Sequence, residues 1–125
     1  KLKQEGKEVF VDISLAGKEY TFVFDSGRFL SMIDTSVARE VNAEIFNDLE
    51  LGKMPSQAGG EERVVACITK NFIIGGAEIK SFEPGTCNLK NIGIDAKGVI
   101  GADVLQYFDG IADWQSMELY FKPDA

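Results

Sequence analysis

The tripeptide Asp25-Ser26-Gly27 could carry chemistry, because it places one carboxylate directly after an apolar run, Tyr20-Thr-Phe-Val-Phe24. Aspartate, serine and glycine favour a tight turn at the end of a strand, through local hydrogen bonds and backbone freedom. A carboxylate held on such a turn can act as a general acid or a general base. Any strand can also end this way for structural reasons alone, so the rest of the sequence must decide between the two interpretations.

The composition narrows the available reactions. The 125 residues contain no histidine and two cysteines, Cys67 and Cys87. This excludes Ser-His and Cys-His nucleophilic pairs and the usual zinc sites, so we expect no metal and no other cofactor. An enzyme built from this chain would depend on carboxylates. The two cysteines could form a disulfide or remain as buried thiols, and we favour the buried thiols.

Two segments of the chain carry a family pattern. In the first, Asp25-Ser-Gly follows two hydrophobic residues and leads to the pair Ile33-Asp34. In the second, Gly98-Val-Ile-Gly-Ala-Asp103 supplies a hydrophobic pair and a glycine before a helical pattern. Together they resemble the retropepsin-like aspartic proteases, the single-lobe members of the pepsin and retropepsin superfamily. The match is specific over residues 22–41 and 98–121 and loose between them.

The resemblance implies a mainly β fold: a closed or partly open acid-protease β-barrel lobe with one or two short helices and a β-hairpin flap. Residues 1–125 would form a single domain of this kind. Asp25 would be the catalytic residue, with Ser26, Gly27 and Arg28 in the active-site loop. The implied activity is an aspartic endopeptidase that hydrolyses an extended peptide or protein substrate.

The resemblance also implies roles for five further residues. Gly59 and Gly60 would form the tip of the flap over the substrate, although a Gly-Gly pair also suits an ordinary hairpin turn. Gly98 and Gly101 would be structural glycines. Asp103 would cap the following helix rather than act as a second catalytic acid.

One Asp-Ser-Gly motif supplies only half of what peptide hydrolysis needs without a metal or a covalent nucleophile. A base must take a proton from water, and an acid must give one to the leaving nitrogen. Two carboxylates a few ångströms apart can do both because they share one proton, and aspartic proteases are the known example. A twofold homodimer would bring Asp25 against the partner's Asp25. The second lobe of a longer chain is the other source that we consider.

Arg28 departs from the family, whose members place a small residue after the glycine. A guanidinium beside Asp25 would favour the ionised carboxylate and oppose the sharing of a proton. Phe29 and Leu30 could narrow the substrate cleft, or Arg28 could point outward while both pack beneath the loop. The sequence therefore leaves open a relative that keeps the fold but only binds peptide or assembles with a partner.

Hydrophobic periodicity predicts the elements that hold the motif. Apolar residues alternate over 9–15 and again over 20–24, with the turn Ala16-Gly17-Lys18 between them, which predicts a hairpin. Asp34 is the predicted N-cap of a short helix that reaches Val41.

The middle of the chain has a weaker pattern. Residues 42–57 contain apolar positions without a clean period, and no regular element is predicted there. The remaining predicted elements are strands over 63–68, 72–74 and 82–89, the last broken at Pro84-Gly85, a strand end at 98–101, a helix from Asp103, a turn at Gln115-Ser116 and a last strand over 117–121.

Charge and hydropathy exclude several partners. With a formal net charge of −7 and a pI near 4.6, the chain would be repelled by nucleic acid and by anionic membrane surfaces. It contains no apolar run of the ~18 residues that a membrane-spanning helix needs. Because the sequence begins at Lys1 without methionine, we expect a mature product or an excised domain. Localisation stays open, with a lean toward an exported, periplasmic or extracellular, protein.

Overall fold

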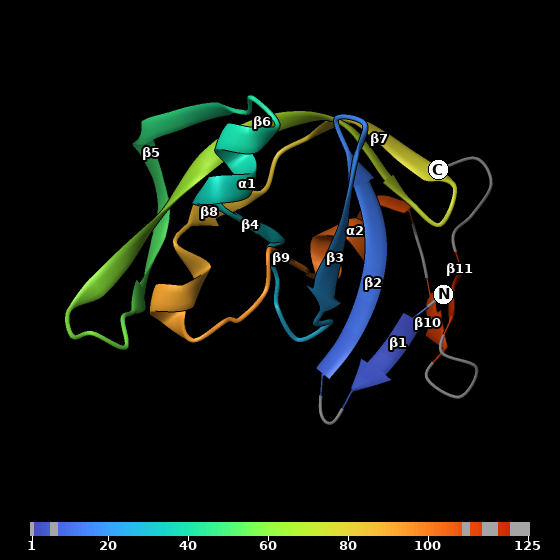
Figure 1. The fold of residues 1–125 in the computed structure, drawn as a ribbon, viewed down its shortest axis with the longest axis horizontal. Helices are drawn as coiled ribbons and strands as arrows, with labels where there is room; N and C mark the ends of the chain where they lie inside the picture. The colour runs from blue at the N-terminus through green and yellow to red at the C-terminus, as the bar shows by residue number, and fades with distance from the viewer. Residues whose placement is uncertain (1, 6–7, 109–110, 114–117, 121–125) are drawn as a thin grey trace.

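A computed structural model describes residues 2–5, 8–108, 111–113 and 118–120, which form a mainly β structure with two short α-helices (Figure 1). The strands are β1 (Leu2–Glu5), β2 (Glu8–Leu15), β3 (Lys18–Phe24), β4 (Met32–Asp34), β5 (Glu44–Pro55), β6 (Glu61–Ile74), β7 (Ala77–Phe82), β8 (Gly85–Cys87), β9 (Gly98–Ile100), β10 (Ile111–Asp113) and β11 (Glu118–Tyr120). The helices are α1 (Thr35–Glu40), α2 (Ala102–Phe108) and the 3₁₀ helix η1 (Leu89–Ile92).

The strands β2 and β3 form the predicted antiparallel hairpin. Alternate residues of the two strands point inward and are almost fully buried: Val11, Ile13, Leu15, Phe22 and Phe24. The turn between them has positive φ at Ala16 and Gly17, 52° and 82°, as a two-residue hairpin turn requires. Burial of one face fixes the register of this hairpin, because a slip by one residue would expose the whole apolar set.

Six strands close into a ring in the order β2, β3, β9, β4, β8 and β6, and β6 pairs back to β2. The strand β9 lies between β3, to which it is parallel, and β4, to which it is antiparallel. Phe24 and Ile100, at the carboxyl ends of β3 and β9, are therefore direct neighbours although they are far apart in sequence. The expectation of a mainly β lobe with short helices is confirmed.

The prediction of no regular element over 42–57 is wrong, because this region contains β5, which forms a long hairpin with β6. The pairing register shifts between Phe46 and Gly52, where β5 contains more residues than the facing part of β6. This bulge and the exposure of most β5 side chains remove the alternation that would mark a strand. The predicted strands over 63–68 and 72–74 are in fact one continuous strand, β6.

The other predicted elements are largely found. Asp34 is the N-cap of α1, as predicted, and its side chain accepts a hydrogen bond from the N–H of Ser36. The predicted strand over 82–89 is instead divided between the end of β7, β8 and the start of η1. The last predicted strand corresponds to β11, whereas the turn at Gln115-Ser116 lies outside the described residues.

Most of the buried side chains pack inside the ring, and α1 and α2 add Val37, Ala38 and Val104 to this core. A smaller cluster packs where β4, β6, β8 and η1 meet, and it consists of Met32, Val64, Cys87 and Leu89. None of the described helices has the length and the apolar character needed to cross a membrane.

Candidate active site

Asp25 is the first residue after β3, and the core behind it fixes its backbone. Its N–H donates to the carbonyl of Ile100 at the end of β9 over 2.9 Å. Phe24 and Ile100 are 3% and 0% exposed, so this end of the two strands is held by packing. The side chain of Asp25 is 48% exposed. The structure therefore presents an accessible carboxylate on a well-anchored backbone.

The predicted tight turn follows Asp25, and the carboxylate helps to form it. Oδ1 of Asp25 accepts the N–H of Gly27 at 3.0 Å, and its carbonyl accepts the N–H of Arg28 at 3.1 Å. A Cβ at Gly27 would lie 3.2 Å from the same Oδ1, so glycine keeps the carboxylate uncrowded. Ser26 is exposed, and within the described part of the chain its hydroxyl has no hydrogen-bond partner.

Arg28 turns toward Asp25. Its Nε lies 3.7 Å from Oδ2 of Asp25, and its side chain is 30% exposed. Phe29 is 77% exposed, whereas Leu30 is partly buried. The alternative in which Arg28 points outward and Phe29 packs beneath the loop is therefore wrong. An ion pair this long and this accessible contributes only about 0–1 kcal/mol, so a substrate or a partner could displace it.

The start of α2 supports the loop from behind. The N–H groups of Ala102 and Asp103 donate to the carbonyls of Arg28 and Phe29, over 2.7 Å and 3.2 Å. Ser31, which is fully buried, donates its hydroxyl to Oδ1 of Asp103 at 2.6 Å and its N–H to Oδ2 at 3.0 Å. These four hydrogen bonds fix the loop at its rear.

This arrangement corrects the role predicted for Asp103. Asp103 is the second residue of α2, and its carboxylate binds Ser31 on the loop instead of capping the helix. Ser31 in turn accepts the N–H of Gly101 through its hydroxyl at 2.8 Å. Sequence reasoning missed Ser31, because one serine in an irregular segment has no periodic signal, and only its spacing from Asp25 could have drawn notice.

Two glycines lie where a side chain would not fit. A Cβ at Gly101 would come within 2.7 Å of the carbonyl oxygen of Arg28, and one at Gly98 would come within 2.6 Å of the ring of Phe22. Phe22 is fully buried and has no room to move away. Both glycines therefore permit close approach, of α2 to the loop and of β9 to the core.

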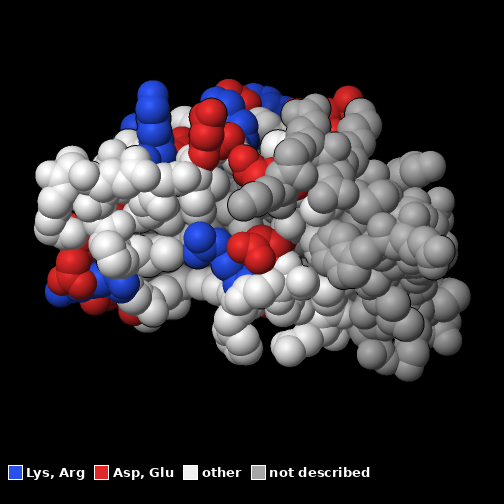
Figure 2. Space-filling model, turned by 90° about the horizontal axis from the view of Figure 1, so that it is seen from below, with Lys and Arg blue, Asp and Glu red and all other residues white. Residues whose placement is uncertain are grey.

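Two hollows flank Arg28, which lines both. The larger one measures about 460 Å³ and exposes Asp25 and Ser26, with Glu8 and Asp95 also on its walls. The smaller one measures about 180 Å³ and lies between the loop and β5. Seen from the side on which β3 ends, charged groups of both signs meet near the middle of the face, and a largely uncharged stretch separates them from a second mixed group at the end where the β5–β6 hairpin turns (Figure 2).

The residues predicted for the flap tip lie at the turn of the β5–β6 hairpin. Gly59 and Gly60 are exposed there, with φ of 97° and 72°. The N–H of Gln57 donates to the carbonyl of Asn91 over 2.8 Å, which holds this turn against η1. Among the described residues, no hydrogen bond joins the turn to the Asp25 loop. In the described residues, these two predicted parts of the site are therefore not joined by hydrogen bonds.

Asp34 is the other carboxylate of the motif, and its role is structural. Its Oδ1 accepts the N–H of Leu89 at 2.9 Å, while Oδ2 accepts both the N–H and the hydroxyl of Ser36. Burial alone would raise the pKa of Asp34, but the hydrogen bonds from Ser36 and Leu89 and the charge of Lys97 outweigh it and hold the pKa below its ordinary value. The ionised side chain joins β4 to α1 and η1.

Cys67 and Cys87 are free, buried thiols. Burial raises the pKa of Cys67 to about 12, and burial together with the charges of Glu62 and Asp34 raises that of Cys87 to about 11. Neither is an activated nucleophile, because the reactive thiolate is disfavoured at neutral pH. The described residues contain no cluster of three or more histidines, cysteines or carboxylates that could hold a metal ion.

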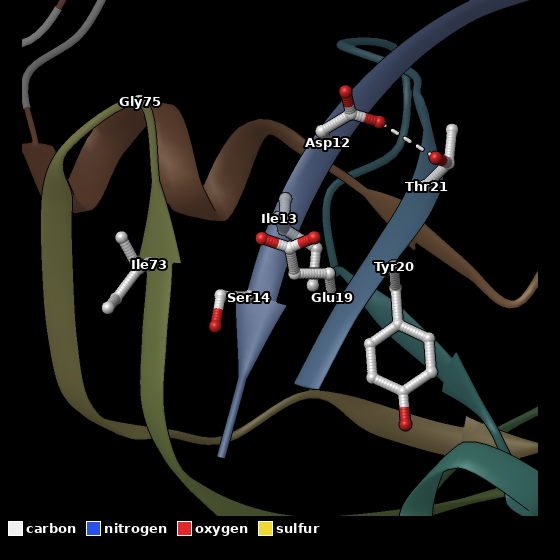
Figure 3. A pocket seen from close by; sticks show the side chains of 8 residues that line it. All are labelled: Asp12, Ile13, Ser14, Glu19, Tyr20, Thr21, Ile73 and Gly75. Atoms are coloured by element: carbon white, nitrogen blue, oxygen red, sulfur yellow. Dashed lines mark hydrogen bonds between the residues drawn. The ribbon is translucent and has the colours of Figure 1, made fainter. Parts of the chain in front are cut away.

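A separate hollow of about 450 Å³ lies on β2, β3 and the end of β6, and Figure 3 shows its lining. Asp12 in this hollow accepts a hydrogen bond from the hydroxyl of Thr21 at 2.7 Å. Apart from the buried Ile13, its residues are partly or fully exposed, and Asp25 is not among them. We therefore assign the candidate active site to the Asp25 loop, where the fold converges on one carboxylate.

Comparison with solved structures supports this fold assignment. The chain is similar to a retropepsin-like aspartic protease from Rickettsia conorii, with a TM-score of 0.63, 16% identity, and coverage of 90% of this chain and 81% of the other. It is also similar to EIAV protease in complex with the inhibitor HBY-793, with a TM-score of 0.61, 13% identity, and coverage of 86% and 93%. A third match is the retroviral protease-like domain of Ddi1 from Leishmania major, with a TM-score of 0.64, 17% identity, and coverage of 95% and 91%.

No family model matches the sequence, and no curated protein matches it significantly. The structural matches nevertheless extend over most of both chains in each pair. The chain therefore has the retropepsin-like fold, as the resemblance of its two motif segments implied.

Proposed function

We propose that the protein is an aspartic endopeptidase in which Asp25 of two copies of the chain forms the catalytic pair. One observation carries this proposal: within a retropepsin-like fold, a half-exposed carboxylate stands on a turn that β3, β9 and α2 anchor. Catalytic groups need such fixed positions, because small displacements from the productive geometry cost large factors in rate.

A twofold dimer is the simplest source of the second carboxylate. On a twofold axis one loop meets its own copy, so one motif supplies two aspartates. Asp25, Ser26 and Gly27 are all exposed in the single chain, and the unpaired hydroxyl of Ser26 could donate across such an axis. Two carboxylates brought this close share one proton, which provides an acid and a base together.

The pair would activate one water molecule. The ionised carboxylate takes a proton from water while the water oxygen bonds to the peptide carbonyl carbon, and the protonated carboxylate gives its proton to the carbonyl oxygen. In the tetrahedral intermediate, one hydroxyl then returns a proton to the pair, the pair protonates the leaving nitrogen, and the C–N bond breaks. The products are a carboxylic acid and an amine, and the pair ends with its single shared proton.

The substrate would lie extended between the Asp25 loop and the β5–β6 hairpin. An extended peptide can pair its main chain with strand edges while its side chains enter pockets on either side. Gly59 and Gly60 would then act as the tip of a flap that moves from its place beside η1 to close over the peptide. Because both residues are glycines, the tip has no side chains that would obstruct that movement, and glycine adopts the positive φ of this turn without strain.

A second function is favoured by the contact of Arg28 with Asp25 at 3.7 Å. If the guanidinium keeps both carboxylates of a pair ionised, no proton is shared and the fold would bind peptide or a protein partner without cleaving it. The same loop could also serve as one lobe of a larger two-lobed protease, with the second aspartate supplied by the other lobe.

The direct test is cleavage of an unfolded protein at acidic to mildly acidic pH. We expect cleavage that a statine-type transition-state mimic inhibits and that Asp25→Asn abolishes. The control is Asp12→Asn, which removes a carboxylate from the hollow of Figure 3 and should leave cleavage intact. Activity that survives Asp25→Asn would refute the proposal.

Sedimentation distinguishes the remaining alternatives. A homodimeric enzyme should sediment as a dimer at the concentrations where it cleaves. A strictly monomeric chain without activity would instead support the lobe of a larger protease, and a dimer that binds peptide but never cleaves it would support the binding module.

A further inference from the structure

The smaller of the two hollows beside Arg28 is built as a side-chain pocket. One wall is the loop after Asp25, the other is β5, and Val64 of β6 closes it from behind. Its apolar lining consists of Phe29, Leu30, Met32, Leu51, Met54 and Val64. Phe29 and Leu51 are 77% and 46% exposed, so the pocket has apolar surface that a bound side chain would cover.

The size of this pocket suits one side chain. Its volume is about 180 Å³, whereas sites for drug-sized molecules usually measure about 300–1,000 Å³. Gly85 packs closely against this lining, because a Cβ at this residue would lie 2.7 Å from Val64, 3.2 Å from Leu30 and 3.5 Å from Leu51. All three of these neighbours line the pocket.

The charges around the pocket differ from those of the rest of the protein. Its lining contains Arg28 and Lys53 and no carboxylate, although the chain has a net charge of −7. The hollow on the other side of Arg28 contains three carboxylates, those of Glu8, Asp25 and Asp95. One side of the loop is therefore cationic and apolar, and the other side is acidic.

Lys53 is available to a ligand. It is exposed, and within the described part of the chain it forms no ion pair. Glu50, an acidic residue of the same strand, is already paired with Arg63, whose Nε lies 2.7 Å from Oε1 of Glu50. Arg63 also donates to the carbonyl of Asn47 at 2.9 Å, so it holds the bulged part of β5 that leads into the pocket wall.

We propose that this pocket selects peptides in which an aliphatic side chain is accompanied, one or two positions away, by an acidic side chain. The aliphatic group fills the pocket against its apolar lining, and the carboxylate pairs with Lys53 at the rim and, when it displaces Asp25, with Arg28. This inference rests on the proposed function, because it names the substrate class of the same cleft.

The test is a matched set of peptides that differ only next to a leucine, where each carries Glu, Gln or Lys. We expect kcat/KM to be about two- to fivefold higher for Glu than for Gln, the range for an accessible ion pair, and lowest for Lys. Replacing the leucine by alanine should cost about tenfold or more. Equal rates for Glu, Gln and Lys would overturn the inference.

Two variants separate the pocket from general charge effects. Lys53→Gln should reduce the preference for Glu over Gln to near one, while Lys80→Gln, the loss of an equally exposed lysine on β7, should retain it. Gly85→Ala should weaken the preference for leucine over alanine, because the added methyl would press on Val64 and Leu30 and force the pocket lining to shift. Loss of the Glu preference in both lysine variants would point to net charge alone and would contradict the proposal.

Binding to the Asp25→Asn protein separates failure of this inference from failure of the proposed function. Fluorescence anisotropy with the same labelled peptides should rank Glu above Gln above Lys without any cleavage. If the ranking holds but the unsubstituted protein never cleaves, the pocket stands and the endopeptidase fails. If the unsubstituted protein cleaves and no ranking appears in either assay, the endopeptidase stands and the inference fails.

Discussion

The two sides of the Asp25 loop differ sharply. On its rear side, Ser31 is fully buried and its hydroxyl and N–H are both bonded to Asp103. On its front side, Asp25, Ser26 and Gly27 are exposed, and the contact with Arg28 is long. On the rear side, buried hydrogen bonds fix the backbone of the loop. On the front side, the polar groups of the loop remain available to a ligand. This is the arrangement expected of a site rather than of a structural turn, because a structural turn has no need of such rigid support.

The largest loss of stability should come from removing the hydrogen bonds on the rear side of the loop. Asp103→Ala would leave the hydroxyl and N–H of buried Ser31 without an acceptor, which should lower the free energy of unfolding by about 2–4 kcal/mol. Urea unfolding followed by circular dichroism measures this loss. Asp48→Ala, at an exposed position of β5, is the control and should change stability by less than about 0.5 kcal/mol. A similarly small effect of Asp103→Ala would show that the rear bonds do not hold the loop.

A smaller effect on stability should follow from substitution of Asp34, whose carboxylate joins β4 to α1 and η1. Its pKa is lowered in the folded protein, so its ionised form contributes stability that is present above about pH 4, the ordinary aspartate pKa, and is lost as pH falls through the lowered value. Asp34→Asn keeps an N-cap acceptor and removes the titration. The acid sensitivity of unfolding should therefore be weaker in Asp34→Asn, measured by denaturation at pH 7 and at pH 3. Identical pH profiles for the two proteins would contradict this assignment.

The smallest effect on stability should come from removing the Arg28–Asp25 contact on the front side of the loop. Arg28→Ala removes an accessible ion pair and should change the free energy of unfolding by less than about 1 kcal/mol. Its effect on cleavage should be clearer: if the cation beside Asp25 silences the carboxylate pair, the rate of cleavage should rise when that cation is removed. Arg28→Lys keeps the charge and is the matched control. If Arg28→Ala and Arg28→Lys cleave the peptide at the same rate, the charge of Arg28 does not govern the pair.

Parts of this picture could be predicted from the sequence. The β2–β3 hairpin alternates because one of its faces packs into the core, and the Asp25 turn follows directly from where β3 ends. The strand β5 could not be recognised, because its side chains are mostly exposed and a bulge interrupts its register. Hydrophobic periodicity reflects the burial of side chains, so a strand whose side chains are mostly exposed shows little alternation in its sequence.

The support of the loop was also beyond sequence reasoning. Ser31 and Asp103 are distant in sequence, and only the ring of strands brings them together. From local pattern alone, an aspartate at a helix start predicts a cap, and this was the role assigned to Asp103. The pocket beside Arg28 could not be predicted for the same reason, since its walls come from the loop, β5 and β6, which only the fold brings together.

The central claim is that two chains contribute one Asp25 each to one catalytic pair. The most direct test mixes unsubstituted protein with Asp25→Asn protein at constant total concentration, after the subunits have exchanged, and measures peptide cleavage. If each active unit needs an aspartate from both chains, activity should follow the square of the unsubstituted fraction and fall to about one quarter in an equal mixture. A linear dependence, with about one half of the activity remaining, would show that each chain works alone and would contradict the shared pair.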